Sequence, residues 1–485
     1  MSSTLLLFFV LCYFTVLLAV AYFTSRGSNN ETFFIGNKSS NWMLVAFGMI
    51  GTSLSGVTFV SVPGTVATAG FSYFQVVLGY FIGYFAVAFI LLPLYYKLNL
   101  TSIYAYLNHR LGTAAYKTGA LFFIVSRTMG ATLRLYLVIN VMQLFILDRM
   151  GVPFIVTTLL ILFMILLYTY QGGVKTIVWT DTLQTFFMLL ALVVCVVYIL
   201  NDMGVSLGTA LSKMNELNYL NVFNINPLDK TFFLKQIVGG AFITISMTGL
   251  DQEMMQKNIS VKRLSDSQKN MLTFSTIMVL VNLLFLVLGG LLYLYAAQKG
   301  ISATGDDLFP TIALDHFPAA ISIIFIIGII SALFPSADGA ITALTATFCI
   351  DMLGIQRNES LTEEQRSSIR KKVHLSFAGI FLLCVMYFKW LDNKSIITIL
   401  LDIAGYTYGP LLGLFAFGIL TTRHLNNKWV VFVCLLAPAM CYLFQTYAVH
   451  LLGNYRIGIE LLILNGALTF AGLCAISKKK LNVLQ

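Results

Sequence analysis

The stretch Trp179-Thr-Asp-Thr-Leu-Gln184 places an acidic side chain, Asp181, near the start of an apolar run that extends from residue 177 to residue 200. A run of this length can cross a membrane as one helix. Because an aspartate at the centre of a spanning helix costs roughly 2.5–3.5 kcal/mol, an intramembrane carboxylate indicates a cation or proton site. A second acid, Asp338, lies in another apolar run, within Ser331-Ala-Leu-Phe-Pro-Ser-Ala-Asp-Gly339. Two such acids predict a membrane protein that is coupled to an ion.

The composition excludes most other classes of protein. Of the 485 residues, 58% are hydrophobic and 10% are charged, whereas a soluble domain carries about 25% charged residues. The net charge of +10 does not indicate nucleic-acid binding, since the basic residues are scattered between apolar segments. No nucleophile paired with a base, phosphate-binding loop or metal-ligand cluster is recognisable in the sequence, so we do not expect an enzyme.

The chain contains about thirteen apolar runs that are long enough to be membrane-spanning helices. They lie at residues 4–24, 42–64, 71–96, 118–147, 152–170, 177–200, 232–255, 272–298, 318–348, 374–391, 395–421, 429–448 and 454–476. No linker or soluble segment interrupts the series. Residues 1–485 are therefore predicted to form a single, all-α, polytopic membrane domain.

The distribution of basic residues predicts the orientation of the chain. An odd number of spans places the two termini on opposite sides of the membrane. With the N-terminus outside, most of the 30 basic residues fall in the inner segments, among them Lys257, Lys262 and Arg263. Because cytoplasmic loops carry an excess of Lys and Arg, we expect an outer N-terminus and a cytoplasmic C-terminus. The short loops favour a bacterial plasma (inner) membrane.

Two clusters of small and hydroxylated residues interrupt the apolar runs, Gly51-Thr-Ser-Leu-Ser-Gly56 in the second run and Thr244-Ile-Ser-Met-Thr-Gly249 in the seventh. Most clusters of this kind serve plain helix packing. These two lie five runs apart, where a five-plus-five inverted repeat places its unwound helices. Unwound backbone at this depth lines a cavity, because its free carbonyl and amide groups need an ion or ligand. We therefore expect both clusters to mark broken helices.

Four segments carry a resemblance to a known family. They are Gln171-Gly-Gly-Val-Lys-Thr-Ile-Val-Trp-Thr-Asp-Thr-Leu-Gln184, Asp251-Gln-Glu-Met-Met-Gln-Lys-Asn258, Thr347-Phe-Cys-Ile-Asp-Met352 and Gly405-Tyr-Thr-Tyr-Gly-Pro-Leu-Leu-Gly-Leu414. In this order they resemble the sodium/solute symporter family, which includes sodium/glucose, proline, iodide, monocarboxylate and sialic acid transporters. The resemblance implies a LeuT-type fold with a leading helix at 4–24, an inverted-repeat core at 42–421 and two trailing helices at 429–476.

The resemblance also implies a sodium site between the broken second run and the ninth run. Its backbone carbonyls would come from Gly51, Leu54 and Ala332. The two hydroxyl groups that the family uses at this site map to Pro335 and Ser336. Because proline has no hydroxyl, the sequence departs from the family here, and a neighbouring serine, a freed carbonyl or a water would have to substitute.

Some members of the family hold a second sodium ion deeper in the membrane, with the aspartate of the sixth span. That role maps to Asp181 and to the neighbourhood of Asp338, where an aspartate replaces the usual hydroxyl. A sodium ion between them would offset the repulsion of two buried carboxylates. The alternative is that one of the two acids is protonated.

Arg127 and Arg134 are two helical turns apart in the fourth run, so they share one helix face. Each could be a snorkelling or ion-paired arginine. One of them could instead bind an anionic solute, because a guanidinium holds a carboxylate with two hydrogen bonds. The resemblance supports this, since the sialic acid symporters use an arginine in this helix. The other candidate solute contacts are Ser53, Ser55, Thr58, Gln75 and Thr244.

We therefore expect a sodium-coupled symporter that imports a small polar organic solute, for example sialic acid or another carboxylate. The alternative is a sodium/sugar or polyol symporter. Phe74 and Met247 disfavour a neutral hexose, because sodium/galactose relatives have a glutamate and an aromatic gate there. A rival of another class is an uncoupled solute sensor or channel on the same fold, which Pro335 favours. Sodium ions, one solute and the lipid bilayer are the expected partners.

Overall fold

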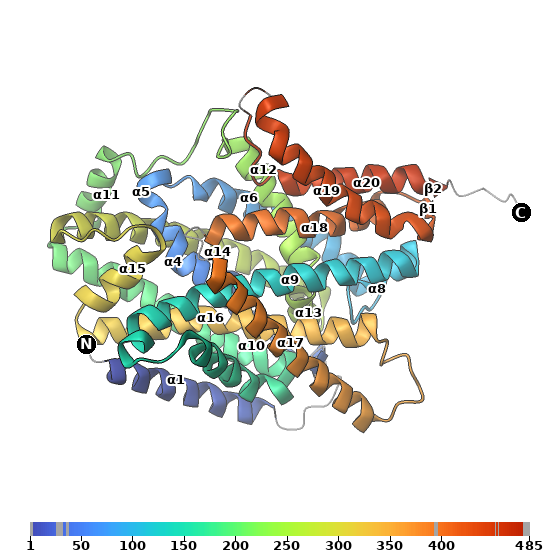
Figure 1. Ribbon diagram of the computed structural model, residues 1–485, viewed down its shortest axis with the longest axis horizontal. Helices are drawn as coiled ribbons and strands as arrows, with labels where there is room; N and C mark the ends of the chain where they lie inside the picture. The colour runs from blue at the N-terminus through green and yellow to red at the C-terminus, as the bar shows by residue number, and fades with distance from the viewer. Residues whose placement is uncertain are drawn as a thin grey trace, which may run out of the picture.

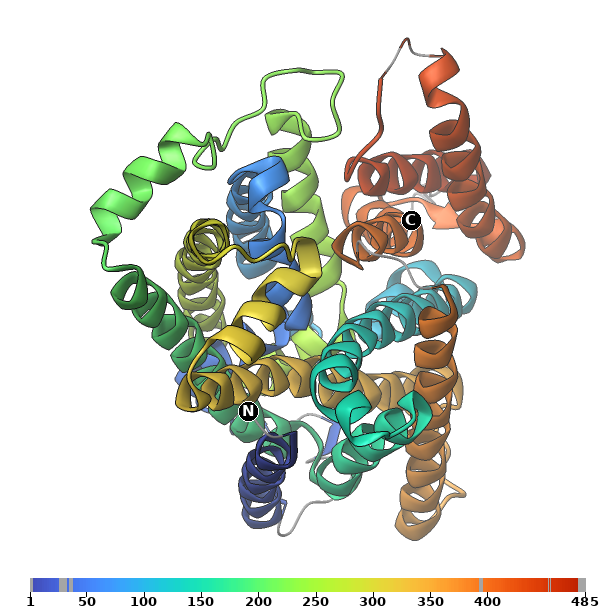
Figure 2. The ribbon, with the colours of Figure 1, turned by 60° about the vertical axis from the view of Figure 1, so that its left-hand side comes forward.

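The computed structural model is a bundle of helices, most of which run along its long axis (Figure 1). It describes residues 3–25, 33–34, 38–391, 396–451, 453 and 455–478. The first helix, α1 (Ser3–Thr24), begins at one end of the bundle, and the last strand, β2 (Ser477–Lys478), lies at the other end. Helices α1 and the pair α19 and α20 lie at separate edges of the bundle, with the other helices between them (Figure 2).

The other elements have these bounds. The α-helices are α3 (Trp42–Ser53), α4 (Gly56–Gly64), α5 (Val66–Ala69), α6 (Tyr73–Ala86), α7 (Leu92–Lys97), α8 (Ala105–Leu111), α9 (Thr113–Met142), α10 (Phe154–Met203), α11 (Leu207–Glu216), α12 (Phe233–Thr244), α13 (Gln252–Ile259), α14 (Leu264–Lys299), α15 (Leu308–Thr311), α16 (Ala319–Thr347), α17 (Glu363–Leu391), α18 (Ile396–Leu420), α19 (Asn427–Leu451) and α20 (Leu461–Ile476). Short π or 3-10 turns are η2 (Val87–Leu91), η3 (Gln143–Leu147), η4 (Asp148–Met150), η5 (Ile245–Gly249), η6 (Gly305–Asp307), η7 (Ile312–His316) and η8 (Phe348–Met352).

The helices match the apolar runs of the sequence in position. Among the described residues, nine helices are long and apolar enough to cross a membrane, and two further pairs qualify as bent spans. Phe154–Tyr170 and Leu461–Ile476 are shorter apolar helices. The predicted polytopic helical fold is therefore confirmed, while the count of thirteen spans stays a prediction.

Helix α10 contains two helical segments, Phe154–Tyr170 and Thr176–Met203, on either side of a kink at Gly173, in agreement with the separate runs at 152–170 and 177–200. Gly173 has φ +58°, and a side chain there would collide with the Phe33 backbone, so glycine is required at this bend. Two elements were not expected from the sequence: α11 in the connection 201–231, and the two-residue antiparallel pairing of β2 with β1 (His424–Leu425).

Both predicted helix breaks are present. Helices α3 and α4 meet at Leu54 and Ser55 with a bend of 53°, and Ser55 has an extended backbone. The second bent span runs from α12 through η5 to α13 and bends by 65°. Asp251 begins α13 as its N-cap, where its carboxylate accepts the backbone N–H groups of Glu253 and Met254. The two clusters of small and hydroxylated residues thus mark broken helices.

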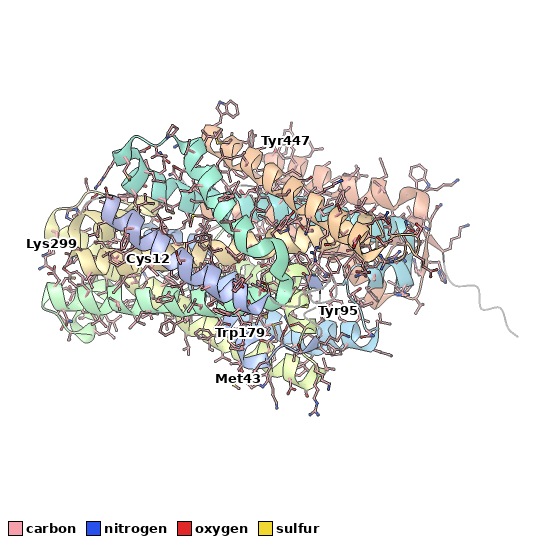
Figure 3. The ribbon with its side chains drawn as sticks, turned by 90° about the horizontal axis from the view of Figure 1, so that it is seen from below. Cys12, Met43, Tyr95, Trp179, Lys299 and Tyr447 are labelled. Atoms are coloured by element: carbon pink, nitrogen blue, oxygen red, sulfur yellow. The ribbon has the colours of Figure 1, made fainter. Side chains whose placement is uncertain are left out.

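Large apolar side chains are exposed around the bundle, which is expected of a surface that faces lipid. Phe23 is 66% exposed and Trp390 is 77% exposed. Figure 3 shows Cys12, Trp179 and Tyr447 on the outside of the helices. The polar side chains discussed below are buried between these helices, so they need partners inside the protein.

Candidate functional site

The first part of the site is the break between α3 and α4. The last helical hydrogen bond of α3 runs from the Leu54 N–H to the Ile50 carbonyl (2.8 Å). The ladder resumes with the Phe59 N–H and the Ser55 carbonyl (3.1 Å). In the described backbone, the carbonyls of Gly51 and Leu54 therefore lack the hydrogen bonds of a continuous helix. These are two of the carbonyls predicted to bind sodium.

The third predicted carbonyl and the predicted hydroxyl lie on α16, which packs on α3 and α4. Ala332 and Ser336 are both buried, and Ser336 Oγ has no hydrogen-bond partner in the described part of the chain. Pro335 lies inside α16, and its missing N–H frees the Ser331 carbonyl one turn earlier. The Ser331 hydroxyl donates to Tyr13 Oη of α1 (2.7 Å), so it is already used elsewhere.

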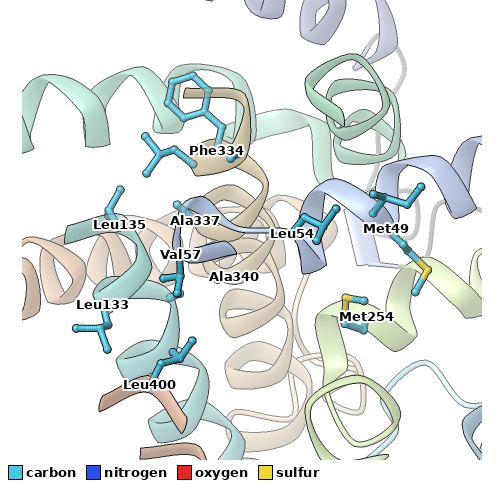
Figure 4. Packing of buried hydrophobic residues seen from close by; sticks show 14 of the residues in the cluster. Met49, Leu54, Val57, Leu133, Leu135, Met254, Phe334, Ala337, Ala340 and Leu400 are labelled. Carbon is cyan, nitrogen blue, oxygen red and sulfur yellow. The ribbon is translucent and has the colours of Figure 1, made fainter. Parts of the chain in front are cut away.

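The surroundings of the break are apolar. Figure 4 shows Met49, Leu54 and Val57 along α3 and α4, with Ala337 and Ala340 from α16. All five side chains are at most 3% exposed. In such surroundings an oxygen without a partner is costly. Free carbonyls and an unpartnered hydroxyl are the hard oxygen donors that suit a sodium ion.

A polar cavity lies between the two bent spans and helices α6, α9, α14 and α18. It is lined by Thr52, Ser53, Ser55, Val57, Thr58, Tyr73, Tyr80, Tyr84, Arg127, Arg134, Ile243, Thr244, Met247, Thr248, Met254, Met278, Asn282, Leu400 and Leu401. All the predicted solute contacts except Gln75 are in this set. The sequence analysis missed the three tyrosines, although their spacing on α6 places them on one helix face.

The structure places Gln75 outside the cavity, unlike the other expected solute contacts. Its side chain is buried, but its amide nitrogen donates to the carbonyls of Ser72 (3.0 Å) and Thr231 (3.3 Å). It therefore joins the start of α6 to the connection before α12 and does not line the cavity. Sequence spacing alone could not separate these two roles, because both require a polar side chain near the start of the helix.

Both arginines of α9 line the cavity, but their electrostatic surroundings differ. Arg127 donates to the carboxylate of Glu253, and its Nη1 lies 3.8 Å from Asp251 Oδ2. Asp251 also accepts the hydroxyl of Tyr408 at 2.9 Å. Arg127 is thus held by two acids of the second bent span.

Arg134 has no such partner among the residues that the structure describes. In the described part of the chain, no carboxylate lies within ion-pair distance of it, and its Nε makes no hydrogen bond. It is only 9% exposed. A buried guanidinium without a counter-ion is costly unless an anion binds it. Its place on the cavity wall therefore fits the binding of a carboxylate.

Lys257 of α13 connects three elements around Asp181. Its Nζ lies 2.6 Å from Asp181 Oδ2 and 2.6 Å from Thr52 Oγ1. Glu253 Oε1 is 3.4 Å from the same nitrogen, and the Thr52 hydroxyl also donates to Asp181 (3.1 Å). Lys257 is 2% exposed and Asp181 is fully buried. Because Glu253 also binds Arg127, a continuous chain of charges links α9, α13 and α10.

Asp338 has partners of its own. Its Oδ2 accepts the hydroxyl of Tyr168 (2.8 Å), and its Oδ1 accepts the N–H of Gly339 (2.5 Å). A lysine ammonium is thus bound at Asp181, where a second sodium ion is predicted, and both oxygens of Asp338 are hydrogen-bonded. The second sodium site stays a prediction.

The burial of Lys257 corrects the assignment made from the sequence, which counted it among the charges of an inner loop. The chain remains helical after the bend, over residues 252–259, and carries Lys257 into the bundle. Two signals were available. Asp251 and Glu253 fall inside the apolar run at 232–255, and Lys257 follows Glu253 by four residues, the spacing of a helical ion pair.

The two bent spans and the polar cavity between them define a membrane transporter of the LeuT type. A solved structure of a Na+-coupled sialic acid symporter, in a substrate-bound outward-open state, superposes with a TM-score of 0.84 at 18% identity, covering 98% of this chain and 99% of that one. A nucleobase-cation-symport-1 family transporter in a closed conformation gives a TM-score of 0.57 at 13% identity, covering 93% and 94%.

Residues 33–428 match the Sodium:solute symporter family, and the chain belongs to this family of sodium-coupled transporters. The sodium/sialic acid symporter SiaT of Proteus mirabilis is 23% identical over 84% of this chain and 83% of its own length. The sodium-coupled monocarboxylate transporter 1 of Mus musculus is 27% identical over 82% of this chain and 66% of its own. The expected family and the expectation of a transporter rather than an enzyme are confirmed.

Proposed function

We propose that this protein is a sodium-coupled symporter that imports a small organic anion, such as sialic acid or another carboxylate. The observation that carries the proposal is Arg134, a buried guanidinium on the cavity wall without an acidic partner in the described part of the chain. A carboxylate in the cavity would supply the missing counter-charge with two hydrogen bonds. Similarity to sialic acid and monocarboxylate transporters supports an anionic solute.

The rest of the cavity suits a polar solute. Ser53, Ser55 and Thr58 line it from the first bent span, and Thr244 lines it from the second. These hydroxyls would bond the polar groups of the solute, and the tyrosines of α6 would pack on its carbon skeleton. Because the two bent spans face each other across the cavity, a bound solute contacts both halves of the predicted repeat.

Sodium would bind at the first break, with the carbonyls of Gly51, Leu54 and Ala332 and the hydroxyl of Ser336. The free carbonyls of the break and the unpartnered hydroxyl of Ser336 support this site. A sodium ion there would tie the bent span α3–α4 to α16 and favour the state that accepts solute. Each sodium ion that enters with the membrane potential contributes about 2.3 kcal/mol per 100 mV to uptake.

The chain would form one membrane domain in a plasma membrane, with a leading helix, a repeat core and two trailing helices. The start of α1 and strand β2 lie toward opposite ends of the bundle, which supports termini on opposite sides (Figure 1). The distribution of basic residues supports an outer N-terminus and a cytoplasmic C-terminus.

The test is uptake into proteoliposomes under an inward sodium gradient, with potassium as the control cation. The labelled panel would contain N-acetylneuraminate, small monocarboxylates, proline, inositol, glucose and galactose. We expect sodium-dependent accumulation of an anionic solute, with a strongly raised KM in Arg134→Gln. Accumulation of a neutral sugar with an unchanged KM in Arg134→Gln would contradict the anion proposal. Binding of a solute without accumulation would indicate an uncoupled sensor or channel.

A further inference from the structure

The environment of Lys257 is that of a bound cation. An ammonium has three N–H donors and no acceptor. Three oxygens surround this nitrogen, those of Asp181 and Thr52 at 2.6 Å each and that of Glu253 at 3.4 Å. Carboxylate and hydroxyl oxygens are also what a sodium ion would take at this position. The lysine side chain therefore fills a site made of hard oxygen ligands.

The acids nearby are already compensated without a second metal ion. Asp181 is ion-paired with Lys257, and Glu253 is shared between Lys257 and Arg127. Asp338 is hydrogen-bonded at both oxygens. Of the Asp181 carboxylate, Oδ1 makes no hydrogen bond in the described part of the chain. A sodium ion at that oxygen would come close to the ammonium, and like charges repel in buried surroundings.

We infer that Lys257 is a built-in cation that takes the place of a second sodium ion at Asp181, so that one sodium ion crosses per solute. The inference rests on the proposed function for its consequence in transport. A sodium ion bound at Asp181 would leave with the solute, whereas an ammonium attached to α13 stays in the protein. The coupling charge moved in each cycle is therefore one smaller than in a carrier with two sodium ions.

The Lys257 ammonium also connects three elements of the bundle. Lys257 lies on α13, the second half of one bent span, and Thr52 lies on α3, the first half of the other. Asp181 lies on α10, which packs on α3 and on α16. The ammonium thus holds both bent spans to the helix that carries Asp181, as a bound metal ion would.

The first experiment counts the sodium ions bound by the purified full-length protein, by saturation with radioactive sodium without solute. We expect one site in the wild type and one in Asp181→Asn. We expect two sites in Lys257→Gln, because without the ammonium a sodium ion from the solution can bind to the Asp181 carboxylate. Two sites in the wild type, one of them lost in Asp181→Asn, would overturn the inference. A single site in a folded Lys257→Gln would overturn it as well.

Two control variants distinguish the specific effect of the Lys257 ammonium from a general effect of removing a positive charge. Lys262→Gln removes a basic residue five positions further on, at an exposed site, and should leave one sodium site. If Lys257→Gln does not fold, the double variant Lys257→Gln with Asp181→Asn removes both charges together. That variant should fold and keep one sodium site. Loss of all sodium binding in it would show that Asp181 holds the coupling ion, against the inference.

The second experiment measures the coupling ratio during transport, at a membrane potential clamped to zero. A tenfold sodium gradient then supports about tenfold accumulation of solute with one ion and about hundredfold with two. Tenfold is the expected result, and hundredfold would overturn the inference while leaving the symporter intact. If no solute in the panel accumulates, the proposed function fails, but one bound sodium ion in the wild type would still support the role of Lys257.

Discussion

Arg127 and Arg134 lie on the same helix, two turns apart, and line the same cavity, yet their partners differ. Arg127 is held by two acids at the start of α13, whereas Arg134 has no ion pair in the described part of the chain. The first arginine therefore belongs to the framework that holds the second bent span. We propose the second as the partner of the solute, since no described carboxylate lies within ion-pair distance of it. The two arginines share their residue type and their helix face. What distinguishes them is whether carboxylates lie nearby.

The largest effect should come from removing the paired arginine. Arg127→Gln leaves the carboxylates of Asp251 and Glu253 with too little positive charge. Removing one partner of a buried ion pair costs about 3–5 kcal/mol, so we expect a large fall in the thermal midpoint of the detergent-solubilised protein. Arg149→Gln is the matched control, because the Arg149–Asp315 pair is exposed. Equal midpoints for the two variants would contradict the framework role of Arg127.

Substitution of Arg134 should affect solute binding and not stability. Arg134→Gln removes the proposed partner of the solute carboxylate. The loss of hydrogen bonds between charged groups costs about 1.5–3 kcal/mol, or roughly 10- to 150-fold in KM for uptake. The thermal midpoint should stay the same or rise, since a buried charge without a partner is removed. A fall in midpoint as large as that of Arg127→Gln would remove the distinction between the two arginines.

A smaller effect is expected at the first sodium site. Ser336→Ala removes one oxygen donor, and we expect the sodium concentration for half-maximal uptake to rise by a factor of about 5–10, equivalent to roughly 1 kcal/mol. Ser331→Ala is the control on the same helix, because its hydroxyl donates to Tyr13. It should leave sodium activation unchanged. An equal shift in both variants would indicate a general effect on α16.

The smallest effect tests the wall of the cavity. Thr244→Val removes a hydroxyl that lines the cavity and should raise KM, since a typical hydrogen bond contributes about 0.5–1.5 kcal/mol. Gln75→Leu removes an amide that bonds to the backbone outside the cavity, so it should lower the thermal midpoint slightly and leave KM unchanged. A KM effect of Gln75→Leu as large as that of Thr244→Val would restore Gln75 as a solute contact.

Much of the fold could be predicted from the sequence because membrane-spanning helices carry a strong local signal. The lengths of the apolar runs predicted the helices, and the small residues at 51–56 and 244–249 predicted the two breaks. The gap between the runs at 152–170 and 177–200 matches the kink at Gly173. The reason for the glycine could not be predicted, since the approach of the Phe33 backbone is a contact between distant parts of the chain.

The candidate site was predicted less completely. The cavity is lined by four of the predicted solute contacts, Ser53, Ser55, Thr58 and Thr244, and their contact with a solute stays a prediction. Lys257 was assigned to a loop, because a basic residue after an apolar run usually lies in one. The bend of 65° instead leads α13 back into the bundle.

The sequence by itself determined that this chain is a helical membrane protein of the sodium:solute symporter family, where its two helices break, and which residues offer oxygen ligands and positive charge. These properties depend on local composition and on motifs. Only the tertiary structure decided which charges are paired with each other. Arg127 and Glu253 are 126 residues apart, and Lys257 and Asp181 are 76 apart. Electrostatic interaction depends on distance in space, so the difference between Arg127, which is ion-paired, and Arg134, which has no ion pair among the described residues, appears only when the helices are packed together.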